Sequence, residues 1–243
     1  MIKIIFYIYL AILAITFVGC VKESPLSDVE LTDPSIVRPD IKFVRMKDNN
    51  TLTTLIGAWI YDKNDNSIEL KNGSVLVNNK EMVVRKLSAS PYYSGIEVIP
   101  AIQLGLTYTV EIKLNPSQSY YASIAIPDKD LSNLTIPSRQ NKYENMKISW
   151  TDVVPSRPLQ LTITNFYKKD NQDLSNIITL DIPPANLTTG EYKISAGVFQ
   201  GYPNIYKTSI ELRSVTNGSI YAGFLKGSKI TCDMSVTKSC DVF

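Results

Sequence analysis

The side chains in this sequence that could carry covalent chemistry are its three cysteines, and Cys20 has the most informative surroundings. A single cation, Lys3, precedes an almost unbroken apolar run from Ile4 to Val18, and the small residue Gly19 stands directly before Cys20. This layout is typical of a secretory signal that is cut after a small residue. We therefore expect residues 1–19 to be a signal peptide. An uncleaved transmembrane helix is the alternative, because the run approaches the ~17–25 residues that a span needs.

The stretch from Thr16 to Glu23 resembles the lipobox of bacterial lipoproteins, in which the cysteine thiol is acylated by chains such as palmitate. One acyl chain holds a protein only reversibly, whereas the several chains of a lipoprotein form a stable anchor. Val21-Lys22-Glu23 also resembles the surface-export signal of Bacteroidota lipoproteins. These resemblances imply an outer-membrane protein that is lipid-anchored through Cys20 and displayed on the cell surface. The periplasmic face of the membrane is the alternative.

The other two cysteines, Cys232 and Cys240, form an even pair near the end of the sequence. In an oxidising compartment such a pair permits a disulfide. Two separate thiols on the last strand and tail are the alternative, since no tight-turn sequence lies between them. A tetrahedral metal site is not expected, because two thiols without histidine would leave it half filled.

Composition argues against catalysis and against a polyanionic partner. The chain has no histidine, so the commonest general base and metal ligand are both missing. No carboxylate pair suits a glycosidase, and Asp62-x-Asn64-x-Asn66 resembles the start of a calcium loop without its glycine or distal glutamate. We interpret that segment as a solvated turn. The net charge of +2 gives no basic field for nucleic acid. We expect no enzyme activity, no cofactor and no metal.

Aromatic side chains are the remaining candidates for ligand contact. Trp59 and Trp150 could stack against the apolar face of a sugar, but both sit in alternating segments, which favours a role in the core. Tyrosines in turn-like sequence suit glycan or protein contact, because each buries area at low entropy cost and carries a hydroxyl. Cross-strand packing is the alternative for each. The candidate contact residues are Tyr92, Tyr93, Tyr202 and Tyr206.

The elements that must position these residues have a period of two. From Leu106 to Leu114, alternate residues are apolar, which predicts a half-buried strand, and Tyr120 to Ile126 repeats the pattern. Earlier predicted strands are Ile41–Met46, Thr54–Tyr61, Ser74–Val77 and Glu81–Leu87, with turn residues at Asn78-Asn79. Later ones are 147–151, 159–164, 177–182, 187–196, Ser219–Leu225 and Lys229–Val236, with a long polar loop at Tyr167–Asp173. No convincing helical stripe follows residue 40, so the fold class is all-β.

Two segments add resemblances to known families. Gly73–Glu81, Tyr93–Gly95, Leu104–Tyr108 and Tyr121–Pro127 resemble the first β-sandwich of certain Bacteroidota lipoproteins encoded beside TonB-dependent receptors. The second half, with Trp150 and the Leu187-x-x-Gly190-x-Tyr192 approach to a tyrosine corner, resembles a fibronectin type III or related Ig-like sandwich. Leu104, Gly105 and Tyr108 resemble a looser tyrosine corner in the first half. These resemblances imply two tandem Ig-like sandwiches and carry over no functional residue.

The predicted organisation follows from these segments and from two polar, proline-containing stretches. It is a signal peptide (1–19), a flexible lipidated tether (20–39), an N-terminal β-sandwich (40–130), a linker (131–145) and a C-terminal β-sandwich with an extra terminal hairpin (146–243). We expect a non-catalytic surface lipoprotein that binds a surface glycan or a protein such as an outer-membrane receptor, as an accessory to a TonB-dependent uptake system. The alternative is a fimbrial subunit or anchor that assembles by strand insertion.

Overall fold

The structure is a computed structural model that describes residues 24–48, 51–87, 90–131, 133–151 and 158–243. The predicted signal peptide and Cys20 lie outside the described residues. Within those ranges no helix is both long and apolar enough to cross a membrane.

Strands dominate the described residues, which confirms the predicted all-β class. The strands are β1 (Arg38–Asp48), β2 (Thr51–Tyr61), β3 (Ser74–Val77), β4 (Lys80–Glu81), β5 (Val83–Leu87), β6 (Ser90–Ser94), β7 (Thr107–Asn115), β8 (Gln118–Ala125), β9 (Arg139–Gln140), β10 (Met146–Ser149), β11 (Leu159–Lys169), β12 (Gln172–Asp181), β13 (Glu191–Ile194), β14 (Ile205–Asn217), β15 (Ser219–Ile220) and β16 (Lys229–Val242). Short helices are the 3-10 turns η1 (Pro25–Asp28) and η2 (Pro34–Ile36), and α2 (Pro184–Thr189) and α3 (Gly197–Gln200).

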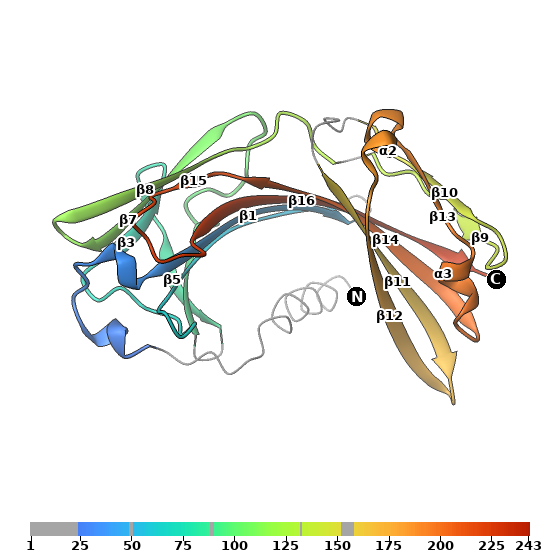
Figure 1. The fold of residues 1–243 in the computed structure, drawn as a ribbon, viewed down its shortest axis with the longest axis horizontal. Helices are drawn as coiled ribbons and strands as arrows, with labels where there is room; N and C mark the ends of the chain where they lie inside the picture. Colours follow the sequence, from blue (N-terminus) through green and yellow to red (C-terminus); the bar gives the residue numbers. More distant parts are fainter. Residues whose placement is uncertain (1–23, 49–50, 88–89, 132, 152–157) are drawn as a thin grey trace.

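One long sheet runs through the described part of the molecule (Figure 1). Its strand order is β12-β11-β14-β16-β1-β2-β6-β5, with β9 added beside β16. A five-stranded sheet, β15-β8-β7-β3-β4, lies near one end, and the pair β10-β13 lies near the other. The last strand, β16, is antiparallel to β14 and parallel to β1. Strands from both halves of the sequence therefore share one sheet.

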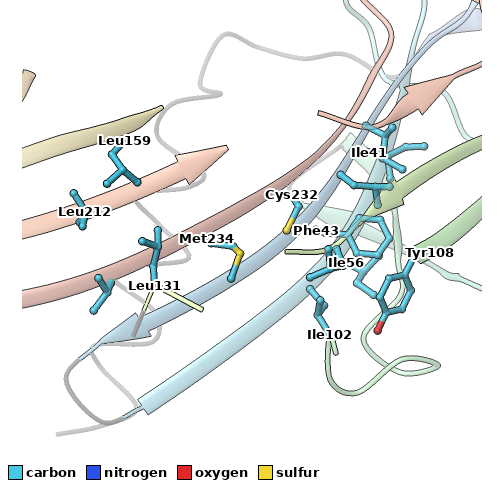
Figure 2. Close-up of a cluster of buried hydrophobic side chains, with 14 of the residues drawn as sticks. Ile41, Phe43, Ile56, Ile102, Tyr108, Leu131, Leu159, Leu212, Cys232 and Met234 are labelled. Atoms are coloured by element: carbon cyan, nitrogen blue, oxygen red, sulfur yellow. The ribbon is translucent and has the colours of Figure 1, made fainter. Parts of the chain in front are cut away.

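The core lies between the long sheet and the two smaller ones, and it forms a single cluster. Alternate residues of β1 point into it, and the ring of Phe43 lies 5.2 Å from that of Tyr108 on β7. Figure 2 shows side chains of β1, β2, β14 and β16 meeting in this cluster. At the other end of the cluster, the helix α3 contributes the fully buried Phe199. The period-two pattern of the sequence is thus the pattern of burial.

The structure does not show the two predicted domains as separate units, because strands from both share the long sheet. The predicted linker contributes Leu131 and Leu134 to the core, and its β9 pairs with β16. The predicted boundaries at 40–130 and 146–243 stay a prediction. The expected terminal hairpin is not formed, because β15 pairs with β8 in the five-stranded sheet while β16 enters the middle of the long sheet.

The tether prediction is corrected for its described part, because residues 24–37 lie against the folded chain. The hydroxyl of Ser24 donates to Asp62 at 2.6 Å, and the backbone N–H of Glu69 donates to Ser27. Leu31 and Val37 are buried in the core. Proline at the start of each 3-10 turn suits this compact path. The polar side chains on which the prediction of a flexible tether was based instead form hydrogen bonds with the first half of the fold.

Two tight turns explain how short the connections are. Asn78 and Asn79 have φ of 47° and 63° between β3 and β4, where turn residues were predicted. Asp170 and Asn171, with φ of 52° and 61°, join β11 to β12 in the same way. Two successive positive φ values are the mark of a type I′ hairpin, which Asn and Asp tolerate. The predicted long polar loop at Tyr167–Asp173 is therefore wrong, because β11 and β12 extend to this turn.

A tyrosine-corner contact is present in the first half of the fold. The hydroxyl of Tyr108 accepts the backbone N–H of Gln103 at 2.9 Å, and Gly105 between them has φ of 74°. This is the tie between a strand and its preceding loop that the Leu104-Gly105-Tyr108 resemblance implied. In the second half, Gly190 has φ of 67° and caps the helix α2, and Tyr192 packs against the core.

Candidate functional site

A cluster of aromatic and charged side chains lies on the face of the long sheet that points away from the core. Because Ile41 points into the core, its neighbours Asp40 and Lys42 point to the opposite face. Lys229 of β16 and Trp59 of β2 stand directly opposite Asp40 in the strand registers. We call these side chains the outer-face cluster: Asp40, Lys42, Trp59, Tyr92 and Lys229.

The aromatic part of the cluster is a stacked pair. The rings of Trp59 and Tyr92 have centroids 5.6 Å apart and planes inclined by 16°. The Lys42 ammonium lies 5.7 Å from the Trp59 centroid. The indole occupies the space above Gly57, where an added β-carbon would lie 2.6 Å from the Trp59 ring. Glycine at this position is therefore what lets the indole settle on the sheet, and both rings are half-buried.

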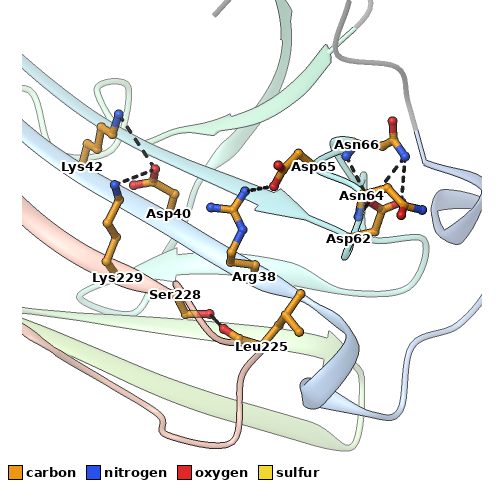
Figure 3. A network of polar contacts seen from close by, with 10 residues as sticks. All are labelled: Arg38, Asp40, Lys42, Asp62, Asn64, Asp65, Asn66, Leu225, Ser228 and Lys229. Atoms are coloured by element: carbon orange, nitrogen blue, oxygen red, sulfur yellow. Dashed lines mark hydrogen bonds and ion pairs between the residues drawn. The ribbon is translucent and has the colours of Figure 1, made fainter. Parts of the chain in front are cut away.

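The charged part of the cluster centres on a buried carboxylate (Figure 3). Asp40 is 5% exposed, and its Oδ2 lies 3.6 Å from Lys229 Nζ and 3.9 Å from Lys42 Nζ. Both separations exceed hydrogen-bond length. The other oxygen, Oδ1, is buried and has no hydrogen-bond partner within the described ranges. A buried acceptor in this state is costly, because its hydration is lost without replacement.

Two further ion pairs border the cluster. Arg38 donates to Asp65, and its guanidinium lies 4.8 Å from the Tyr61 ring centroid. Burial raises the pKa of Tyr61 to about 12, so this phenol is neutral at physiological pH. On the opposite side, Arg85 donates to Glu97 at 2.8 Å. Ion pairs this exposed contribute little to stability, so we regard them as the polar rim of the cluster.

The two neighbouring candidate tyrosines on β6 point in opposite directions. Tyr92 belongs to the outer-face cluster. Tyr93 is 2% exposed, and its hydroxyl accepts the backbone N–H of Leu70 at 2.7 Å. Burial raises the pKa of Tyr93 above its usual range. The prediction that Tyr93 contacts a ligand is therefore corrected, because its side chain is part of the core.

The other two candidate tyrosines lie far along the sheet order, beside β11 and β12. Tyr202 packs against Tyr167, with ring centroids 5.1 Å apart, and its hydroxyl accepts from the Asn176 amide. Tyr206 is 40% exposed on β14, and loss of hydration, with nearby Asp173, raises its pKa. Neither residue joins the outer-face cluster, and their role as ligand contacts stays a prediction.

The two described cysteines are too far apart to bond. Cys232 and Cys240 lie on the same strand, β16, and both are buried. Eight residues of extended strand place them ~27 Å apart at ~3.4 Å per residue. The disulfide allowed by the sequence is thus not formed, and the alternative of two thiols is what the structure has. Burial, with the charge of Asp241, raises the pKa of Cys240 to about 11, so this thiol is a poor nucleophile.

Two other sequence candidates have structural roles. Trp150 is 5% exposed and lies in the core, as the alternating pattern favoured. Asp62 organises the turn between β2 and β3, accepting the backbone N–H of Asn64 at 2.7 Å and of Asn66 at 3.0 Å. Burial alone would raise its pKa, but the hydrogen bonds from Ser24 and the turn lower it. Within the described residues no group of three or more potential metal ligands is found.

Sequence reasoning missed the charged half of the outer-face cluster. Asp40 and Lys229 are separated by most of the chain, and only the parallel register of β1 and β16 brings them together. Trp59 was assigned to the core because its strand alternates, yet Ala58 and Ile60 take the inward positions. The signal that could have placed it is Gly57, two residues away on the same face, which leaves room for a large ring.

Comparison with known proteins identifies no family for this chain. No family model matches the sequence. No curated protein matches it either. Among solved structures, the chain is weakly similar to the crystal structure of the FN1-FN3 domains of chicken CNTN1, with 9% sequence identity and a TM-score of 0.25. The match covers 87% of this chain and 66% of that one. The all-β class rests on the strands of the described residues.

Proposed function

We propose that the protein is a non-catalytic lipoprotein of the outer membrane, anchored through Cys20, that binds a glycan or protein partner at the cell surface. In this proposal it is an accessory to a TonB-dependent nutrient-uptake system. The observation that carries the binding function is the outer-face cluster. A stacked Trp59–Tyr92 pair beside a buried carboxylate combines apolar area with polar groups that fix orientation, as binding sites commonly do.

The cluster lies on a sheet face, which is a better place for partner contacts than the tips of turns. The cluster draws on β16, β1, β2 and β6, which neighbour one another in the long sheet. Side chains that stand on paired strands are held more precisely than side chains on loops. The sequence had favoured loop tyrosines, so the proposal moves the contact surface from turn tips to a sheet face.

The docked N-terminal segment limits how far the protein could stand from its anchor. Three residues lie between Cys20 and Ser24, and the four residue steps from one to the other span at most ~14 Å when the chain is extended. Ser24 is hydrogen-bonded to Asp62, in the turn that also holds Asp65, the partner of Arg38 at the edge of the cluster. A lipid on Cys20 would therefore hold this end of the cluster near the membrane surface.

The binding function is tested by photo-cross-linking on intact cells that display the full chain. We compare the wild type with a Trp59→Ala/Tyr92→Ala double variant. Tyr121→Ala is the matched control, because Tyr121 is 58% exposed on β8 in the five-stranded sheet. Loss of cross-linked partner in the double variant alone supports the proposal. Equal cross-linking by all three proteins contradicts it.

The anchor is tested separately by metabolic labelling with palmitate. The proposal requires label in the wild-type chain and none in Cys20→Ala. Protease treatment of intact cells then separates surface display from the periplasmic alternative, because only a displayed protein is digested. An unlabelled wild-type chain would remove the lipoprotein part of the proposal while leaving the binding part open to its own test.

Assembly by strand insertion is the second candidate function, and the edge strand β12 favours it. In the strand order β12 pairs with β11 alone among the described strands, and its Ile177 is 64% exposed. A long edge strand with exposed apolar residues is a template for pairing with another chain. This function predicts polymers that grow with protein concentration in size-exclusion chromatography. A protein that stays at one size at all concentrations argues against it.

A further inference from the structure

The outer-face cluster has the chemistry of a sugar site, and we infer that it binds an uncharged pyranose. This inference rests on the proposed binding function and narrows it to one ligand class. Three features carry the inference: the buried carboxylate of Asp40, its separation from the two lysines, and the aromatic pair beside it.

One oxygen of the Asp40 carboxylate, Oδ1, has no hydrogen-bond donor among the described residues. This oxygen is buried, and the residue is more than nine-tenths buried. A buried carboxylate normally accepts several hydrogen bonds. A ligand hydroxyl is a donor of the right kind, because an ionised carboxylate only accepts. Hydrogen bonds from a hydroxyl to a charged oxygen are also stronger than neutral ones.

The two lysines pair with Asp40 Oδ2 without a short hydrogen bond. Their ammonium groups lie 3.6 and 3.9 Å from Asp40 Oδ2, beyond direct hydrogen-bond length. Separations of this size are commonly bridged by a small polar group. The Lys229 side chain is 52% exposed, so it can move aside or donate to a second ligand oxygen. A carboxylate flanked by ammonium groups can thus take a hydroxyl as donor and its neighbour as acceptor.

The aromatic pair supplies the second half of the recognition. Trp59 stands directly opposite Asp40 across an antiparallel pair of strands, where Cα atoms lie ~4.5–5.5 Å apart. A ligand ring that lies against the indole would have Asp40, on the neighbouring strand of the same face, as its polar contact. The C–H face of a pyranose is apolar and flat enough to pack on an aromatic ring. Tyr92 extends that surface to the next strand of the sheet.

Charge favours an uncharged sugar. The cluster and its rim hold Asp40 with Lys42 and Lys229, and the ion pairs Arg38–Asp65 and Arg85–Glu97. These are four cations and three anions, so the net charge is close to balance. A uronate would be attracted by the two lysines and repelled by the buried Asp40, and an amino sugar would meet the reverse, so neither charge gains from the site. A neutral pyranose meets neither repulsion.

The test is isothermal titration calorimetry of the mature full chain with neutral, acidic and amino oligosaccharides, chosen first on a glycan array. We expect binding of neutral sugars, at least a tenfold loss of affinity in Asp40→Asn, and a larger loss in Trp59→Ala. Tyr121→Ala is the control and should bind as the wild type does. Melting curves of each variant separate loss of binding from loss of folding.

Two results would overturn the inference. Unchanged affinity in a folded Asp40→Asn variant would show that the carboxylate does not contact the ligand. Binding of acidic or amino sugars alone would show that the ligand class is wrong. If no saccharide binds while cell-surface cross-linking still depends on Trp59 and Tyr92, the sugar inference fails and the proposed binding function stands. If neither depends on them, both fail.

Discussion

The adjacent residues Tyr92 and Tyr93 allow a sharp test, because they have one side-chain type and opposite environments. Tyr93→Phe removes the hydroxyl that accepts the Leu70 N–H at 2.7 Å, and both residues are buried. Leaving a buried N–H without an acceptor costs ~1–3 kcal/mol. For a chain of this size, ~1 kcal/mol lowers the melting temperature by ~2–4 °C. We therefore expect Tyr93→Phe to melt roughly 4–8 °C below the wild type if the cost is ~2 kcal/mol.

Tyr92→Phe is the matched control, because it makes the same chemical change on the outer face. A half-buried surface position away from such a hydrogen bond should shift the free energy of unfolding by no more than ~0.5 kcal/mol. The measurement is thermal unfolding followed by circular dichroism, with ligand binding measured in parallel. The assignment of Tyr92 to the outer face and of Tyr93 to the core is refuted if Tyr92→Phe is the less stable variant. A one-residue slip of β6 would produce that reversal, since it exchanges the two faces.

Three further predictions follow from the core, the thiols and the docked segment. Leu134→Ala, in the predicted linker, should cost ~2–5 kcal/mol and lower one shared unfolding transition, whereas two separate transitions in the calorimeter would favour independent domains. Cys232 and Cys240 should resist a thiol reagent until the protein is denatured, and a reductant should leave the melting temperature unchanged. Hydrogen bonds lower the pKa of Asp62 in the folded protein. The ionised carboxylate therefore stabilises the fold at pH values above the ordinary aspartate pKa of ~3.9, and this contribution is lost as the pH falls below that value. Melting curves from pH 6 to pH 2.5 should therefore fall less steeply for Asp62→Asn than for the wild type.

Local patterns predicted the strands well because burial alternates strictly along them. The predicted Ser74–Val77 has the bounds of β3, and Leu106–Leu114 differs from β7 by one residue at each end. Asn78-Asn79 predicted a turn because asparagine tolerates positive φ. The same chemistry at Asp170-Asn171 was read as part of a long loop, since the flanking lysines and glutamine masked two strand ends. There the edge position of β12 tolerates polar residues on both faces.

The pairing of strands that are distant in sequence could not be predicted in the same way. Alternation indicates which side chains share one face of a strand, but it does not indicate which other strand pairs with it. Nothing in the sequence of β16 indicates that it lies between β14 and β1, or that it runs parallel to β1. The same limit applies to Trp59. Alternation predicts that Trp59 and its neighbour Ile60 point to opposite faces of the sheet, but it does not indicate which of the two points inward. Packing decided the matter, because Ala58 and Ile60 fill the core while Gly57 leaves room on the outer face.

The parallel pairing of β1 and β16 connects the fold to the candidate site. Asp40 belongs to the first strand and Lys229 to the last, so the carboxylate and its nearest ammonium meet only when the two strands pair. Contacts between residues so distant in sequence form late, since the loop that joins them must close first. The outer-face cluster should therefore be lost with the central pairing even where local strands survive. A truncation that removes β16 should abolish sugar binding while far-ultraviolet circular dichroism still reports strand. Retained binding in such a truncated chain would show that Trp59 and Tyr92 suffice and that the Asp40–Lys229 contact is incidental to recognition.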